Sequence, residues 1–137
     1  MSDIALDLRS LVNAIDRLRE GLARYQQDIT DTQIRDGLIQ RFEFTYEVSH
    51  KMLKRYLEMA SATPEQFDSM PFADVIRTGN EQGLLLSDWL RWRQFRDMRS
   101  KTSHTYDEAI ALHVVADIPA FLAEAVYLCD QLKARVA

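Results

Sequence analysis

The chain has 137 residues, 47% of them hydrophobic and 28% charged, and its net charge is −4. This length corresponds to one domain, residues 1–137, which is large enough to bury a core without disulfides or a structural metal. The acidic balance argues against a general nucleic-acid-binding protein, and the single cysteine, Cys129, excludes a disulfide framework and a paired-cysteine metal site. The first ten residues lack the basic and apolar regions of a secretory signal, and we identify no apolar stretch near the ~20 residues that cross a membrane. We therefore expect a cytoplasmic protein without membrane contact.

Apolar residues recur at helical spacing from the start of the chain. The first expected helix carries a stripe that advances by fours and threes: Ile4, Leu8, Leu11, Ile15, Leu18, Leu22 and Tyr25. Next, Thr30-Asp-Thr-Gln33 has the form of a capping box, which predicts the start of a second helix. The apolar face then continues to about Ala60, so this helix would be ~42 Å long and would form the spine of the domain.

Shorter elements separate the second helix from the next long one. Thr63-Pro64 predicts a short turn of helix, and a second short helix is expected at Phe72–Gly79. Ser87 or Asp88 then caps a helix that contains both tryptophans. Residues 102–106 lack apolar periodicity, so we expect a turn there.

The last helix begins near Asp107-Glu108, whose carboxylates suit a helix N-terminus. Pro119 interrupts its pattern and predicts either a kink or a new helix start capped by Asp117. We find no strand pattern, repeat or linker. The sequence therefore predicts an all-α, antiparallel up-and-down four-helix bundle with one or two extra short helices.

A cationic segment precedes the expected turn. Residues 91–101 carry a local charge of +4, from Arg91, Arg93, Arg96, Arg99 and Lys101 against Asp97. On an acidic chain, such a segment indicates either a confined phosphate-binding site or the solvated face of an ordinary helix.

Arg99, His104 and Tyr106 follow one another across this helix end. A guanidinium binds phosphate oxygens with a planar fork of donors, and an imidazole moves protons near neutral pH. Metal-free RNA cleavage needs a base, an acid and positive charge at the phosphate, so one arginine and one histidine are half of the set. A two-fold dimer would complete it. The alternative is that His104 is only a helix cap or a surface residue.

Other polar and aromatic residues have simpler interpretations. Glu47-Val-Ser-His50, with Glu43 one turn earlier, matches half of a di-iron motif, but no second Glu-x-x-His exists in the chain. We therefore expect no metal site and interpret these residues as helix-surface groups or as support for other residues. His113 is interpreted as structural, and Trp89 and Trp92 as core or interface residues rather than base-stacking platforms.

Three ordered motifs carry a resemblance to a known family. Arg99-x4-His104-x-Tyr106 resembles the motif of HEPN-domain proteins from bacterial nucleotidyltransferase–HEPN toxin–antitoxin pairs. The stretches 41–47 and 51–57 resemble the second helix of the subgroup called nucleotidyltransferase substrate-binding proteins, and 102–107 resembles its turn. The resemblance covers essentially the whole chain.

The resemblance implies a homodimeric helical bundle that binds a separately encoded small nucleotidyltransferase, the antitoxin. It also implies a metal-independent endoribonuclease that needs no cofactor and acts on RNA at the dimer cleft, with Arg99 stabilising the phosphate and His104 acting as base or acid. We expect Arg96, Lys101 and Ser103 to support RNA binding. In such pairs the partner can transfer AMP to the motif tyrosine, here Tyr106, which would silence the nuclease.

Two departures from the family pattern keep a second function open. Ser100 follows the arginine where the superfamily often has Asn, Asp or His, and His50 stands where the subgroup often has an aromatic residue. Neither change removes a catalytic group. The alternative function is a non-enzymatic subunit that binds substrate for the nucleotidyltransferase.

Overall fold

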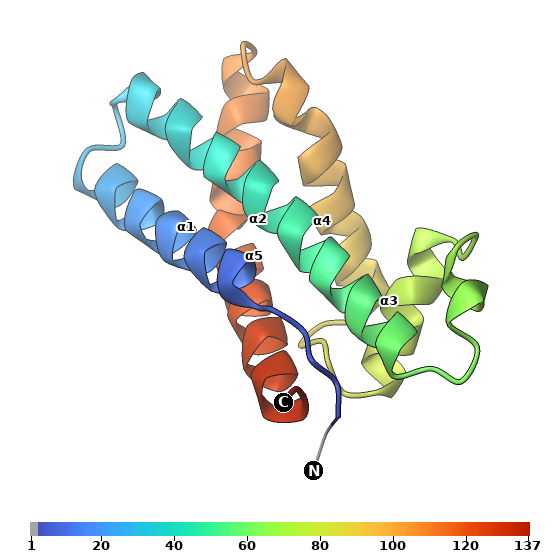
Figure 1. Ribbon diagram of the computed structural model, residues 1–137. Helices are drawn as coiled ribbons and strands as arrows, with labels where there is room; N and C mark the ends of the chain where they lie inside the picture. The colour runs from blue at the N-terminus through green and yellow to red at the C-terminus, as the bar shows by residue number, and fades with distance from the viewer. Residues whose placement is uncertain (1–2) are drawn as a thin grey trace.

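The computed structural model describes residues 3–137, so the first two residues of the predicted domain lie outside it. The described residues form five α-helices and two 3₁₀ helices and contain no strand. In chain order these are α1 (Arg9–Gln27), α2 (Thr32–Met59), η1 (Pro64–Phe67), α3 (Phe72–Glu81), α4 (Trp89–Lys101), η2 (Thr102–His104) and α5 (Glu108–Arg135). The long helices α1, α2, α4 and α5 run up and down in alternation, and η1 and α3 lie beside the C-terminal end of α2 (Figure 1). The predicted all-α bundle with short extra helices is confirmed.

The start of α2 is set by an acidic side chain. The Asp31 carboxylate accepts hydrogen bonds from the backbone N–H groups of Gln33 and Ile34, both at 3.0 Å. The Thr30 hydroxyl instead donates to Asp28 at 2.6 Å. The predicted start and end of this helix, which has 28 residues, are therefore confirmed, but the cap is Asp31 rather than Thr30.

α1 begins later than the apolar stripe predicts. Ile4 lies in a non-helical segment, where it is half-buried against the core and its carbonyl accepts the Ala137 N–H at 2.7 Å. Asp7 forms a local ion pair with Arg9 at 2.6 Å just before the first turn. The apolar spacing thus continues for one turn beyond the helix, because a non-helical segment can also bury residues at that spacing.

α5 continues without interruption through Pro119. Asp117 does not cap a new helix but forms an ion pair with Arg91 of α4 at 3.7 Å, so the alternative of a new helix start is wrong. An 18-residue window of α5 has a mean hydropathy of 1.7, which is enough, with its length, for a membrane-spanning helix. The expectation that the chain has no such stretch is therefore wrong. The helix supplies Val114, Ile118 and Phe121 to the interior, as a core helix does.

The core is centred on aromatic residues from α2, α4 and α5. Phe121 packs edge-on against Phe42 and Phe95, with ring centroids 5.1 and 5.2 Å apart. Trp92 is fully buried beside them, which confirms its predicted core position. Cys129 is also buried, and burial raises the pKa of its thiol, so it is the small core residue that its sequence context indicates.

Candidate functional site

The predicted motif lies at one end of the bundle, where α4 passes through η2 into α5. Thr102 is buried, and its hydroxyl donates to the Arg99 carbonyl at 2.7 Å, which satisfies a backbone acceptor at the end of α4. On the other side, the Asp107 carboxylate accepts the N–H groups of Ala109 and Ile110 at 2.9 and 3.3 Å and caps α5. The segment between them is therefore a short turn fixed at both ends, as predicted.

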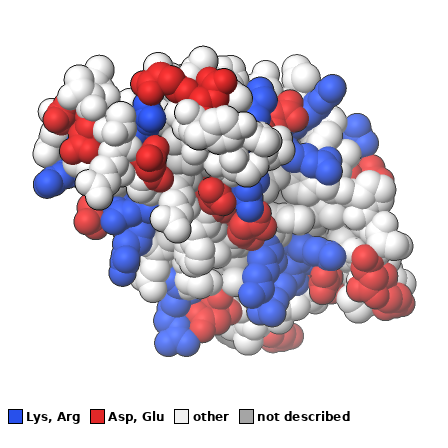
Figure 2. All heavy atoms as spheres, turned by 90° about the horizontal axis from the view of Figure 1, so that it is seen from above, with Lys and Arg blue, Asp and Glu red and all other residues white. Residues whose placement is uncertain are grey.

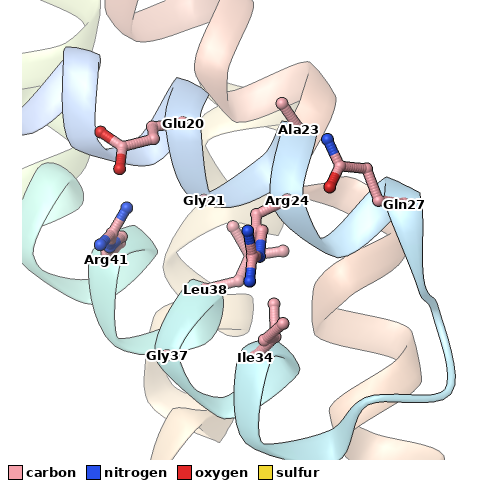
Figure 3. A pocket seen from close by; sticks show the side chains of 9 residues that line it. All are labelled: Glu20, Gly21, Ala23, Arg24, Gln27, Ile34, Gly37, Leu38 and Arg41. Atoms are coloured by element: carbon pink, nitrogen blue, oxygen red, sulfur yellow. The ribbon is translucent and has the colours of Figure 1, made fainter.

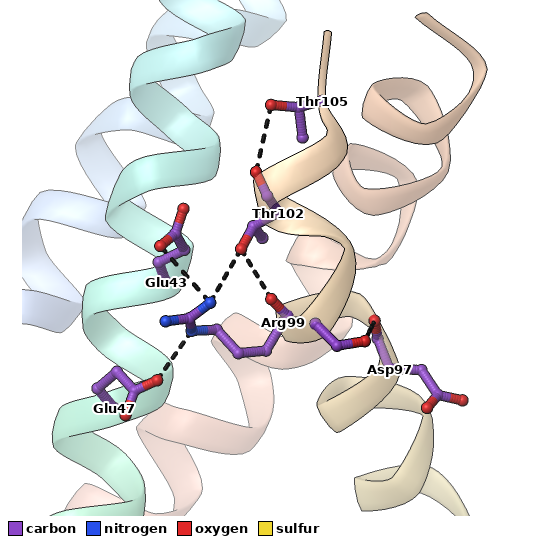
Figure 4. A network of polar contacts seen from close by, with 7 residues as sticks. Glu43, Glu47, Asp97, Arg99, Thr102 and Thr105 are labelled. Atoms are coloured by element: carbon purple, nitrogen blue, oxygen red, sulfur yellow. Dashed lines mark hydrogen bonds and ion pairs between the residues drawn. The ribbon is translucent and has the colours of Figure 1, made fainter. Parts of the chain in front are cut away.

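Arg99 is held against α2 by a set of polar contacts (Figure 4). Its Nε donates to Glu47 at 2.8 Å, and its Nη1 lies 3.6 Å from the Glu43 carboxylate and donates to the Thr102 hydroxyl at 3.1 Å. Glu43 and Glu47 are one turn apart on α2 and so face the same side. Among the described residues, Arg99 Nη2 makes no hydrogen bond or ion pair. The network fixes the guanidinium plane and leaves one nitrogen available for a ligand.

His104 and Tyr106 lie on the surface of the turn. Their rings pack edge to face, with centroids 6.0 Å apart and an interplanar angle of 76°. Tyr106 is 87% exposed, and the His104 imidazole is exposed and makes no hydrogen bond among residues 3–137. No hydrogen bond or ion pair joins Arg99 to His104 within the described chain. One copy therefore presents the histidine and tyrosine to solvent beside an arginine that is already oriented.

The arginine and lysine side chains around the motif lie apart from one another and do not form one cluster. Arg96 lies over the Phe72 ring at 5.3 Å, and Arg91 lies over Phe95 at 4.9 Å. Lys101 is exposed and lines a shallow cavity of about 210 Å³ between α4 and α5. Ser103 is exposed on η2. Seen from above, this end of the molecule alternates basic and acidic side chains (Figure 2), so it offers separate positive points rather than a continuous basic patch.

The sequence did not reveal that Glu43 and Glu47 bind Arg99. Their spacing indicates a shared face of α2, and the sequence allows either half of a metal site or support for other residues. In the structure they support Arg99. No group of three or more His, Cys, Asp or Glu residues within 3–137 is arranged to hold a metal ion. His50 packs edge-on against Phe72 at 4.8 Å, and burial lowers its pKa. His113 is exposed and lines the cavity between α4 and α5, so it is not a residue of the buried core.

The fold and the motif turn define the class: a small helical-bundle protein with an arginine–histidine–tyrosine turn at one end. The chain belongs to the nucleotidyltransferase substrate-binding protein-like family, whose model matches residues 6–134. This confirms the subgroup that the motifs indicate.

Two comparisons each find a match in Haemophilus influenzae. One, named probable ribonuclease HepT, is 40% identical over 110 residues, which cover 80% of this chain and 75% of the relative. The other is a solved structure described as the fold of a substrate-binding domain of a nucleotidyltransferase, with a TM-score of 0.87 and 34% identity. The match covers 93% of this chain and 99% of that one. The two names point to the two functions that the sequence leaves open.

Proposed function

We propose that this chain is a HEPN toxin, a metal-independent endoribonuclease that acts in the cytoplasm and is neutralised by a cognate nucleotidyltransferase. The observation that carries the proposal is the motif turn, where Arg99 is oriented by Glu43 and Glu47 while His104 and Tyr106 stand exposed. The ribonuclease name of a relative 40% identical to this chain supports the same assignment.

The proposed reaction is an internal phosphoryl transfer within RNA. One His104 acts as base and takes the proton of a ribose 2′-hydroxyl, whose oxygen then attacks the adjacent phosphorus. The bond from phosphorus to the 5′-oxygen breaks, and the His104 of a second copy protonates that leaving oxygen. The products carry a 2′,3′-cyclic phosphate and a 5′-hydroxyl, with no net gain or loss of protons.

Arg99 stabilises the charge that develops on the phosphate oxygens. Its free Nη2 donates to the phosphate while Nε and Nη1 stay bound to α2 and Thr102, so the guanidinium needs no reorientation during the reaction. A homodimer is part of the proposal, because base and acid come from two copies of His104.

Tyr106 is the proposed site of control by the partner. Its exposed phenol oxygen attacks the α-phosphorus of ATP held by the nucleotidyltransferase, pyrophosphate leaves, and the phenol proton passes to solvent. The added phosphate then competes with RNA for Arg99 and carries negative charge to His104.

The cleavage proposal is tested with end-labelled RNA in excess chelator, using protein purified without the nucleotidyltransferase. Intact mass first shows that Tyr106 is unmodified. We expect products ending in 2′,3′-cyclic phosphate. Absence of cleavage by this unmodified protein contradicts the nuclease.

The second candidate is a non-enzymatic subunit that presents substrate to the nucleotidyltransferase, and the family description and the solved structure's description favour it. It predicts a stable complex with a separately encoded small nucleotidyltransferase and no cleavage. Co-purification alone agrees with both candidates, so cleavage by the isolated protein decides between them.

A further inference from the structure

A groove runs along the seam between α1 and α2, and Figure 3 shows the side chains that line one part of it. It consists of two adjoining cavities of about 460 and 660 Å³, which share Gly37 and Arg41 as lining residues. On α1 the lining extends from Ser10 to Gln27, about 25 Å at the rise of an α-helix. The groove is therefore long enough for an extended chain rather than a small molecule.

Its charge is positive on an otherwise acidic protein. Arg17 and Arg24 lie two turns apart on α1, and Arg41 lies opposite on α2, while Glu20 is the one carboxylate among the lining residues. Figure 3 shows Arg24 extending from α1 toward α2. Among the described residues none of these three arginines forms an ion pair, and the Arg41 side chain donates only one hydrogen bond, to the Arg17 carbonyl at 2.8 Å. Arginines elsewhere on α1, such as Arg19, are paired with a carboxylate.

The groove also offers space and one aromatic surface. A Cβ added at Gly37 would meet no atom within 4 Å. A Cβ added at Gly21 would lie 3.1 Å from Arg41 Cδ, so the absence of a side chain there makes room for Arg41. Phe44 lines one end and is 58% exposed. Phe44 is the one large apolar side chain that is well exposed along the lining, whereas a docked helix needs anchors at several turns.

We propose that this α1–α2 groove binds single-stranded RNA, with Arg17, Arg24 and Arg41 on the phosphates and Phe44 stacking on a base. Unpaired guanidinium groups along a groove with a stacking aromatic are the features of a single-strand track. Phe44 faces α1 whereas the next residue toward the start of α2, Glu43, contacts Arg99 of α4, so the groove and the motif lie on different sides of α2. The inference rests on the proposed nuclease, since it concerns how that enzyme holds its substrate.

The test measures fluorescence anisotropy of a labelled oligouridylate of about 12 nucleotides, titrated with full-length His104→Ala protein so that RNA is not consumed. Combining Arg17→Gln with Arg24→Gln is expected to weaken binding at least about tenfold and to reduce the slope of log K against log salt by about 1.4. Gly37→Leu, which fills the groove without changing charge, is expected to weaken binding while leaving the protein folded. The matched control is Arg19→Gln with Arg77→Gln, which removes the same charge from exposed pairs outside the lining.

Binding within about twofold of the parent for both groove variants overturns the inference, and so does an equal loss in the control. A polyaspartate peptide of similar length that binds as tightly, with the same dependence on the groove residues, would assign the groove to an acidic protein segment instead.

Cleavage assays with His104 intact separate this inference from the proposed function. If the nuclease is real but the groove is not its track, the groove variants cleave RNA with an unchanged KM. If the wild type never cleaves, groove-dependent binding still reports on the groove alone.

Discussion

Arg99 is the residue on which the proposed chemistry depends most, and its environment explains why an arginine is needed. Three of its contacts, to Glu47, Glu43 and Thr102, use Nε and Nη1, and the remaining nitrogen is free within the described chain. A lysine ammonium is a point charge that cannot keep these contacts and bind phosphate with a fixed fork.

We therefore expect Arg99→Lys to lower the single-turnover rate of RNA cleavage about 100-fold. Arg96→Lys is the matched control, because Arg96 lies over Phe72 and a lysine keeps its charge there; its rate should stay within about twofold. Equal losses in the two variants would show that net charge, rather than the held guanidinium, supports cleavage.

His50 is a second residue with a measurable consequence. Burial lowers its pKa below the ordinary 6.5, with Lys54 and Arg96 acting in the same direction and Glu47 against it. As the pH falls below 6.5, the unfolded chain takes up a proton that the folded imidazole resists, so stability decreases toward acid pH.

Replacing His50 by Phe removes this titration and keeps an aromatic ring against Phe72. The wild type should lose more of its melting temperature between pH 7 and pH 5 than His50→Phe loses, as measured by circular dichroism. A variant that loses as much as the wild type would mean that other groups cause the acid sensitivity.

Among the elements, α5 and α2 begin in the same way but with different neighbours. Asp107 caps α5 directly after the motif turn, and Asp31 caps α2 at the same end of the bundle without forming part of the motif. Arg35 of α2 further fixes the start of α5 through a 2.9 Å ion pair with Glu108. Loss of the Asp107 cap therefore loosens the segment that carries His104 and Tyr106.

Asp107→Ala and Asp31→Ala should each lower the free energy of unfolding by about 1 kcal/mol in urea. Only Asp107→Ala should also slow RNA cleavage, because losing the cap frees the turn that carries His104. We expect a loss of about tenfold, which corresponds to about 1.4 kcal/mol in the activation free energy. If the two variants cleave equally well, the rigidity of the turn does not matter to the reaction.

The elements were largely predictable from local sequence, because apolar spacing and helix caps act within one or two turns. The errors have the same origin. The cap of α2 is Asp31 rather than the predicted Thr30, and Ile4 packs in a non-helical segment rather than in a helix. The Arg99–Glu47 contact joins residues 52 apart, so it depends on how α4 packs against α2, and no local pattern predicts it.

At the scale of the whole molecule, the proposed reaction requires two copies. One chain presents one exposed His104 and one oriented Arg99, whereas the proposed base and acid are two histidines. Sedimentation at assay concentrations should therefore give twice the 15.9 kDa mass of the chain. Dilution into the monomer range should abolish cleavage, and full activity of a monomer would refute the shared centre.

The role of His104 in RNA cleavage is tested most directly by comparing two histidines in one assay. Wild type, His104→Ala and His113→Ala are incubated with end-labelled RNA in chelator, after circular dichroism shows that all three are folded. Both imidazoles are exposed, but only His104 belongs to the motif turn. We predict that cleavage by His104→Ala is slower by about 1000-fold or more, while His113→Ala cleaves like the wild type. Cleavage by His104→Ala at the wild-type rate would contradict it.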